Sequence, residues 1–60
     1  MASIPDDYHE KIKKLRKKFD MTQIKFAHLL GVSFATVNRW ENRQVKPSPL
    51  AWARIVKFDD

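Results

Sequence analysis

The sequence has no cysteine and a single glycine, and its longest uninterrupted apolar run is four residues. Without cysteine, neither a disulfide nor a thiolate zinc site can stabilise the chain, so its stability must come from packing. Four apolar residues are too few to cross a bilayer, and no membrane partner is expected. Acidic residues also occupy the N-terminal stretch where a signal peptide would be basic and then apolar. These absences predict a cytoplasmic protein.

Groups that could carry catalysis or hold a metal are scarce. His9 and His28 stand far apart without a partner at metal-ligand spacing, so His9 is expected at the surface and His28 at or near it. The chain offers no nucleophile–base set and no glycine-rich loop to hold phosphates. We therefore predict a protein that is not an enzyme and that uses no metal, no cofactor and no small-molecule substrate.

Positive charge is concentrated in the middle of this 60-residue chain, which is short enough to form one domain, residues 1–60. Residues 11–57 contain all 12 lysines and arginines and only two acids, Asp20 and Glu41, which gives them a net charge of +10. A body this basic favours a polyanionic partner, although ribosomal and membrane-surface proteins have similar compositions.

Four helical segments with short connections are predicted, which makes the fold all-α. The first follows Pro5, and its apolar residues recur at helical spacing: Tyr8, Ile12, Leu15 and Phe19. Asp20 interrupts this pattern where a left-handed residue could end the helix. The lysines between the apolar residues are expected to form a solvated face.

The other three segments begin at residues that cap helices well. Thr22 and Ser33 precede helical patterns, and Ser48 is followed by Pro49, which suits the first helical position. Gly31 ends the second segment because it tolerates a positive φ angle. The predicted helices cover about residues 23–30, 34–42 and 49–57.

The segment from residue 22 to residue 42 has inward and outward positions. Ala27 is small enough to let two helices cross near Gly31. Larger apolar residues are expected to point inward: Phe26, Leu30, Val32, Val37 and Trp40. The third helix leaves a different set on its other side: Phe34, Ala35, Asn38, Arg39 and Asn42. One face of this helix therefore suits a core, and the other is left for something else.

This pattern resembles the helix-turn-helix of phage repressors, the Cro/XRE-like family, over about residues 10–56. The matching positions are Leu15-Arg16, Met21-Thr22-Gln23, Phe26-Ala27, Leu30-Gly31-Val32-Ser33, Thr36-Val37, Arg39-Trp40-Glu41-Asn42 and Pro47-Ser48. One pair alone would be a weak sign, but the joint spacing is specific. The resemblance implies a small bundle of four to five helices, like that of lambda repressor, with a helix-turn-helix at about residues 22–42.

The resemblance also implies roles for individual residues toward double-stranded DNA. The helix at 33–42 would enter the major groove and read bases with Phe34, Ala35, Asn38 and Arg39. The DNA backbone would be contacted by Gln23, Lys25, Thr36, Asn42, Arg43 and Lys46. Arg16 and Glu41 stand where the family commonly has an ion pair between the first helix and the recognition helix. Such a protein would be associated with the nucleoid if its source is a bacterium.

Several positions admit a second interpretation. Phe34 could pack into the core, because exposing a phenyl ring costs burial energy, and Asn38 and Arg39 could form a solvated helix face. Trp40 continues an apolar face and is expected in the core, whereas Trp52 could lie in the core or at an exposed interface.

The chain also departs from the family pattern. Lys25 stands where the family often has Glu, and this placement against the helix dipole makes sense beside a phosphate. Arg43 and Asp20 replace frequent glycines, and a positive φ at Arg43 would cost about 1 kcal/mol. Many relatives have a fifth helix, so the last segment either closes the core or leaves a face for a partner chain: Leu50, Trp52, Ile55, Val56 and Phe58.

Together these features predict sequence-specific binding of double-stranded DNA by a small, repressor-like transcriptional regulator. A homodimer on a palindromic site is expected, because one small module would bind weakly. Two alternatives remain. The chain could be the DNA-targeting module of a larger DNA-modifying enzyme or antitoxin, or a helical module whose basic face binds an acidic protein or RNA.

Overall fold

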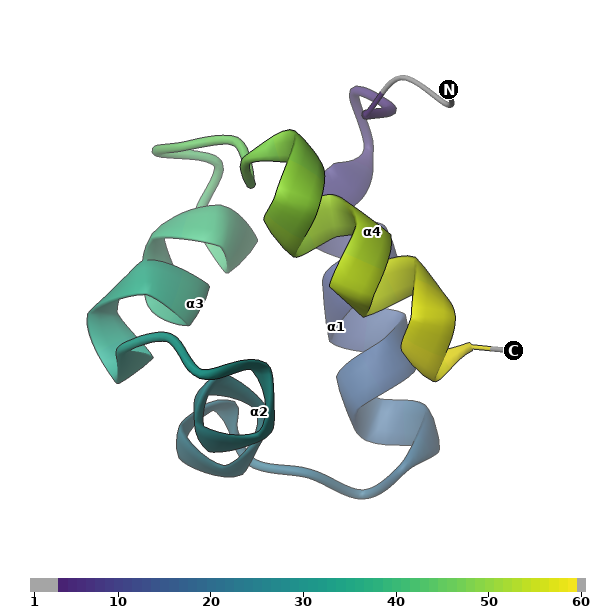
Figure 1. Ribbon diagram of the computed structural model, residues 1–60, viewed down its shortest axis with the longest axis vertical. Coiled ribbons are helices and arrows are strands. Elements are labelled where there is room, and N and C mark those ends of the chain that lie inside the picture. The colour runs from purple at the N-terminus through teal and green to yellow at the C-terminus, as the bar shows by residue number, and fades with distance from the viewer. Residues whose placement is uncertain (1–3, 60) are drawn as a thin grey trace.

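Four helices lie within residues 4–59, the part of the chain that the computed structural model describes (Figure 1). They are α1 (Tyr8–Lys18), α2 (Gln23–Leu30), α3 (Phe34–Glu41) and α4 (Pro49–Phe58). The described residues contain no strand, so the predicted all-α fold is confirmed. α1 and α4 lie on one side of the bundle, and α3 lies on the other. None of these four helices is long and apolar enough to cross a membrane.

Side-chain caps fix where three of the helices begin. The hydroxyl oxygens of Thr22, Ser33 and Ser48 each accept a hydrogen bond of 3.1 Å from the backbone N–H three residues later. Each cap satisfies an N–H that has no partner inside the helix. The three predicted starts are therefore confirmed. α1 has no such cap. Asp7 precedes this helix, but its side chain forms no capping hydrogen bond.

Three residues with positive φ angles allow the chain to turn after α1, α2 and α3. They are Asp20 (φ 54°), Gly31 (φ 74°) and Arg43 (φ 62°). Gly31 carries no steric penalty in this region, whereas an L-residue with a side chain is strained by about 1–2 kcal/mol. The left-handed conformation predicted for Asp20, and the positive φ considered for Arg43, are both confirmed.

Replacing Arg43 by glycine is therefore expected to stabilise the protein. Arg43→Gly should raise the free energy of unfolding by about 1 kcal/mol relative to Arg43→Ala, because only glycine removes the strain of the left-handed conformation. Both variants lose the same charge, so their difference isolates the backbone effect. Thermal unfolding followed by circular dichroism measures it, and equal midpoints for the two variants would show that residue 43 is not strained.

The core collects the inward faces of all four helices. It consists of Tyr8, Ile12, Leu15, Phe26, Ala27, Leu30, Val37, Trp40, Trp52 and Ile55. The core positions predicted for Ala27 and Trp40 are confirmed, and Trp52, only 8% exposed, proves to be part of the core. Leu50 and Val56 remain exposed, so α4 closes the core with only part of its apolar surface.

Two predictions near α1 are wrong. Phe19, predicted to continue the apolar stripe, is 48% exposed; it follows the last residue of α1, where the backbone turns out of the helix with φ −100° and ψ 11°. His9 was expected at the surface but is half-buried, because its ring packs edge-on against Tyr8 with the ring centroids 5.8 Å apart. Its Nδ1 atom is buried and has no hydrogen-bond partner among residues 4–59.

Candidate nucleic-acid interface

A tight turn sets the angle between α2 and α3. The N–H of Val32 donates to the carbonyl oxygen of Ala27 at 3.0 Å, which closes the end of α2 around the left-handed Gly31. Ala27 is buried at the junction, where its short side chain lets α3 approach. Ser33 then caps α3 directly. The sequence therefore builds a helix–turn–helix from one small residue, one glycine and one cap.

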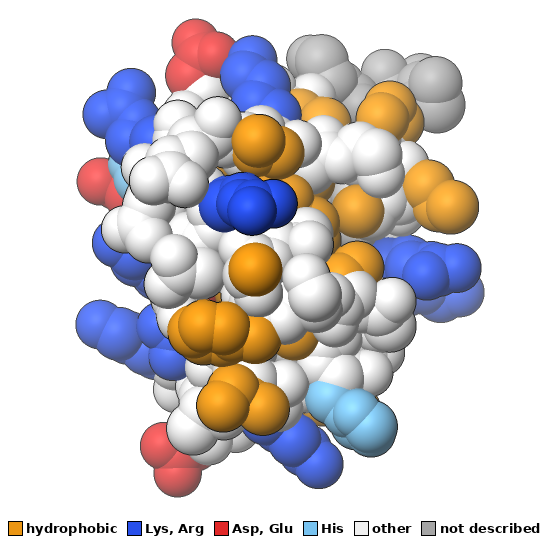
Figure 2. Space-filling model, turned by 90° about the vertical axis from the view of Figure 1, so that its left-hand side faces the viewer, with side chains coloured by type: hydrophobic (Ala, Val, Ile, Leu, Met, Phe, Trp, Pro, Cys, Tyr) orange, Lys and Arg blue, Asp and Glu red, His pale blue; other side chains and the backbone are white. Residues whose placement is uncertain are grey.

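The two sides of α3 have opposite characters. Val37, Trp40 and Glu41 are buried against the rest of the protein. On the other side Ala35 and Arg39 are exposed, and Phe34 is 48% exposed, so its ring is not packed into the core. Figure 2 shows the side of the molecule on which α3 lies, with hydrophobic side chains near its centre, basic side chains among and around them, and acidic ones only near its edge.

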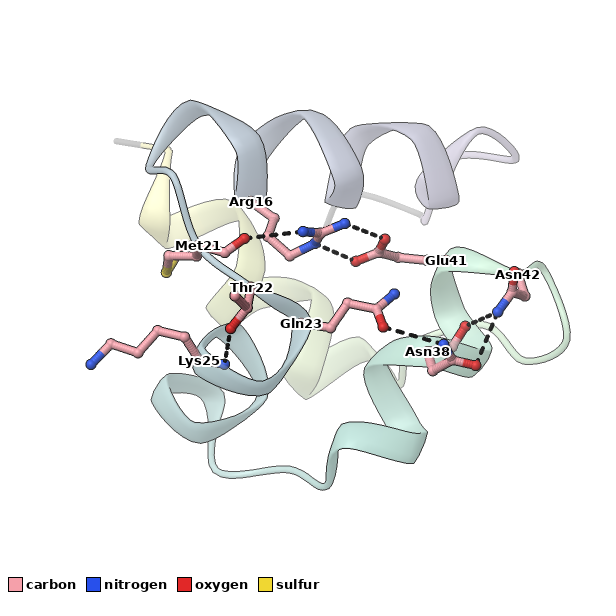
Figure 3. A network of polar contacts seen from close by, with 8 residues as sticks. All are labelled: Arg16, Met21, Thr22, Gln23, Lys25, Asn38, Glu41 and Asn42. Atoms are coloured by element: carbon pink, nitrogen blue, oxygen red, sulfur yellow. Dashed lines mark hydrogen bonds and ion pairs between the residues drawn. The ribbon is translucent and has the colours of Figure 1, made fainter.

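Arg16 and Glu41 tie the end of α3 to α1. Arg16 Nε and Nη2 donate to Glu41 Oε2 and Oε1 at 2.8 and 3.0 Å, and Nη1 donates to the Met21 carbonyl oxygen at 3.0 Å (Figure 3). The hydrogen bonds that Arg16 donates to the Glu41 carboxylate raise the pKa of Arg16 above its ordinary value. The structure thus brings together the pair that the resemblance implied. The pair fixes both the position of α3 and the turn that leads into α2.

A network of side-chain amides joins α2 to the outward side of α3 (Figure 3). Asn38 Nδ2 donates to Gln23 Oε1 at 3.2 Å. Asn42 Nδ2 donates to the Asn38 carbonyl oxygen at 2.9 Å and to Asn38 Oδ1 at 3.0 Å. Both polar atoms of the Asn38 side chain therefore form hydrogen bonds, and the residue is half-buried rather than fully solvated. This network is not predictable from the sequence, since Gln23 and Asn38 meet only through the crossing of α2 and α3.

The other residues that the resemblance assigned to the DNA backbone lie in α2, in α3 and in the loop after α3. Lys25 is exposed in the first turn of α2, and Figure 3 shows its side chain pointing away from the amide network. Thr36 Oγ1 lies 2.8 Å from Ser33 Oγ, so the two hydroxyls bind each other. Arg43 and Lys46 are exposed in the loop after α3, and Lys46 Nζ lies 3.8 Å from Asp6 Oδ1.

The charge that α2 and α3 present to solvent has one sign. Glu41 is the only acidic residue in either helix, and it is 3% exposed and bound to Arg16. Lys25 and Arg39 are exposed, and neither forms an ion pair within residues 4–59. In that part of the chain, no group of three or more His, Asp or Glu side chains could hold a metal ion. The face therefore suits a polyanion.

A family model described as helix-turn-helix matches residues 12–60 of the chain. The chain belongs to the Cro/C1-type helix-turn-helix family. The members of this family bind DNA.

The chain is also similar to curated proteins of Escherichia coli. It is 51% identical over 37 residues to the uncharacterized HTH-type transcriptional regulator YiaG of strain K12, and to the proteins of that name from strains O6:H1 and O157:H7. The matched segment is 62% of this chain and 38% of each relative, so the chain matches well under half of the length of these relatives. No solved structure matches the chain.

Proposed function

We propose that this helix-turn-helix protein binds double-stranded DNA at specific sequences and regulates transcription without catalysing a reaction. The observation that carries the proposal is the outward side of α3, where exposed Arg39 lies one position from Asn38, whose amide is held at both ends. A fixed amide and a free guanidinium on one helix face are the groups that read base edges in the major groove. The names of the relatives support the regulatory role.

In this proposal α3 lies in the major groove and α2 lies across the DNA backbone. Arg39 would donate to guanine O6 and N7, and Asn38 would pair with adenine N6 and N7. Phe34 and Ala35 would complete the base-reading set. Backbone contacts would come from Gln23, Lys25, Thr36, Asn42, Arg43 and Lys46. Asn42 would also act indirectly, since its amide orients Asn38.

The affinity of this complex should depend strongly on salt. If about five phosphates are neutralised, the logarithm of the binding constant should fall with the logarithm of salt concentration at a slope of about −4 to −5. Titrations of one duplex between about 50 and 200 mM salt measure the slope. A slope near zero would contradict a phosphate-based interface, even if binding were detected at low salt.

A single module of this size would bind its site weakly, so the proposed regulator acts as a homodimer on a palindromic site. Two copies would place their α3 helices in successive major grooves on one side of the duplex, about 34–36 Å apart. This spacing corresponds to half-sites one helical turn apart. The spacing of the half-sites in the selected DNA therefore tests whether two copies of the protein bind together.

The decisive experiment is a selection from a randomised duplex library at physiological salt. A two-fold palindrome with half-sites about one turn apart supports the dimeric regulator, and a single enriched motif supports sequence-specific binding by one copy. Recovery of DNA without any enriched motif contradicts base reading by α3. The chain would then be better described as a DNA-targeting or partner-binding module of a larger assembly.

A further inference from the structure

We infer that Phe34, in the first turn of α3, recognises the C5-methyl group of a pyrimidine in the major groove. The inference rests on the proposed function and makes it more specific, because it names the chemical group that one residue reads. Thymine carries this methyl group, and 5-methylcytosine carries the same group on the same ring atom.

The outward side of α3 divides into an apolar turn and a polar turn. Phe34 and Asn38 are four residues apart and lie on one stripe of the helix, and Ala35 and Arg39 form the adjacent stripe. The N-terminal end of this surface therefore consists of a phenyl ring and a methyl group. The next turn carries an amide and a guanidinium. The two turns cannot recognise the same kind of base edge.

The apolar turn remains open to solvent in the free protein. Phe34 is 48% exposed, and Ala35 beside it is also exposed. The core already contains Val37 and Trp40 from the same helix, so Phe34 is not needed to fill it. An exposed phenyl ring gains free energy only when a partner covers it with an apolar group.

The hydroxyl groups next to Phe34 are already engaged. Ser33 Oγ accepts from the N–H of Thr36 at 3.1 Å, and it lies 2.8 Å from Thr36 Oγ1. These groups stabilise the start of α3, which leaves the phenyl ring and the Ala35 methyl group as the chemistry that this turn offers to a base. Neither can form a hydrogen bond.

The thymine methyl is the one apolar group that projects from the base edges into the major groove, where cytosine has only a C–H bond at the same ring position. A polar edge pressed against Phe34 would lose water without gaining a hydrogen bond, so guanine or unmodified cytosine is disfavoured there. The short side chain of Ala35 lets the helix backbone approach the bases closely. The first turn of α3 therefore suits a methylated pyrimidine and penalises the other bases.

The test uses the duplex recovered by selection, with each thymine replaced in turn by deoxyuridine, which lacks only the methyl group. For the wild-type protein, one such replacement should raise Kd about fourfold, the change expected when one buried methyl group is removed. Phe34→Ala should bind the thymine and uracil duplexes equally. Phe34→Leu, which keeps an apolar side chain, should still prefer thymine.

Leu50→Ala is the matched control, because it removes another exposed apolar side chain, 65% exposed, from α4. It should keep the full preference for thymine. A duplex with cytosine at the position where deoxyuridine raises Kd should bind poorly. A duplex with 5-methylcytosine at that position should recover part of the affinity. No effect of uracil at any position, or an unchanged preference in Phe34→Ala, would overturn the inference while leaving a selected motif and the proposed function intact. A selection that enriches no motif would overturn both.

Discussion

Arg16→Met is expected to leave the protein largely unfolded at 25 °C. The substitution removes three hydrogen bonds and leaves the Glu41 carboxylate buried without its partner. Removing one partner of a buried pair costs about 3–5 kcal/mol, which is comparable to the whole stability that a core of this size supplies. Chemical denaturation followed by tryptophan fluorescence should show no cooperative transition starting from a folded state.

Two further variants separate this effect from a general loss of charge. Lys18→Met breaks the ion pair between Lys18 Nζ and Asp59 Oδ1, 2.9 Å long but exposed, and should cost less than about 1 kcal/mol. Arg16→Met combined with Glu41→Leu removes both buried charges and should recover most of the lost stability. If Arg16→Met and Lys18→Met behaved alike, the pair between α1 and α3 would have no structural role.

Arg39→Ala should weaken binding to the selected sequence by about 5- to 150-fold, which corresponds to about 1–3 kcal/mol. Its guanidinium is exposed on the outward side of α3, so under the proposed function the loss would come from base contacts rather than from stability. Binding to duplexes changed at the guanine position should suffer much less. The preference at that position should therefore relax, as measured by competition between the selected and altered duplexes.

Lys25→Ala and Lys14→Ala serve as comparisons, because each removes one exposed positive charge. Lys25→Ala should weaken binding to all sequences alike and reduce the salt slope by about one, as expected for a phosphate contact. Lys14, on α1, should have little effect. Equal and sequence-independent losses in Arg39→Ala and Lys25→Ala would contradict base reading by Arg39.

Local chemistry made most of the fold predictable from the sequence. Thr22, Ser33 and Ser48 act as caps because each offers a hydroxyl oxygen to an N–H three residues away, and Gly31 turns the chain because it lacks a Cβ atom. These effects need no knowledge of distant residues. Trp52 was harder to place, because α4 is apolar nearly all round and its pattern alone does not select one buried face.

The site was less predictable wherever contacts cross between helices. The exposure of Phe34 depends on how much room Val37 and Trp40 leave in the core, which spacing alone does not determine. The bond from Asn38 to Gln23 depends on the crossing of α2 and α3. Arg16 and Glu41 were paired through a family resemblance, since residues 25 positions apart give no local sign that they meet.

The two sides of α3 have a consequence for how this scaffold can be changed. Val37, Trp40 and Glu41 hold the helix in place, and none of them belongs to the outward side. A different set of outward residues could be grafted onto the same sixty-residue frame at little cost in stability, provided that the link between Asn38 and Gln23 is replaced or removed as a pair. Under the proposed function, the residues that read DNA can therefore be exchanged while the residues that hold the fold stay the same. A new DNA preference could arise in this way, by natural drift or by design.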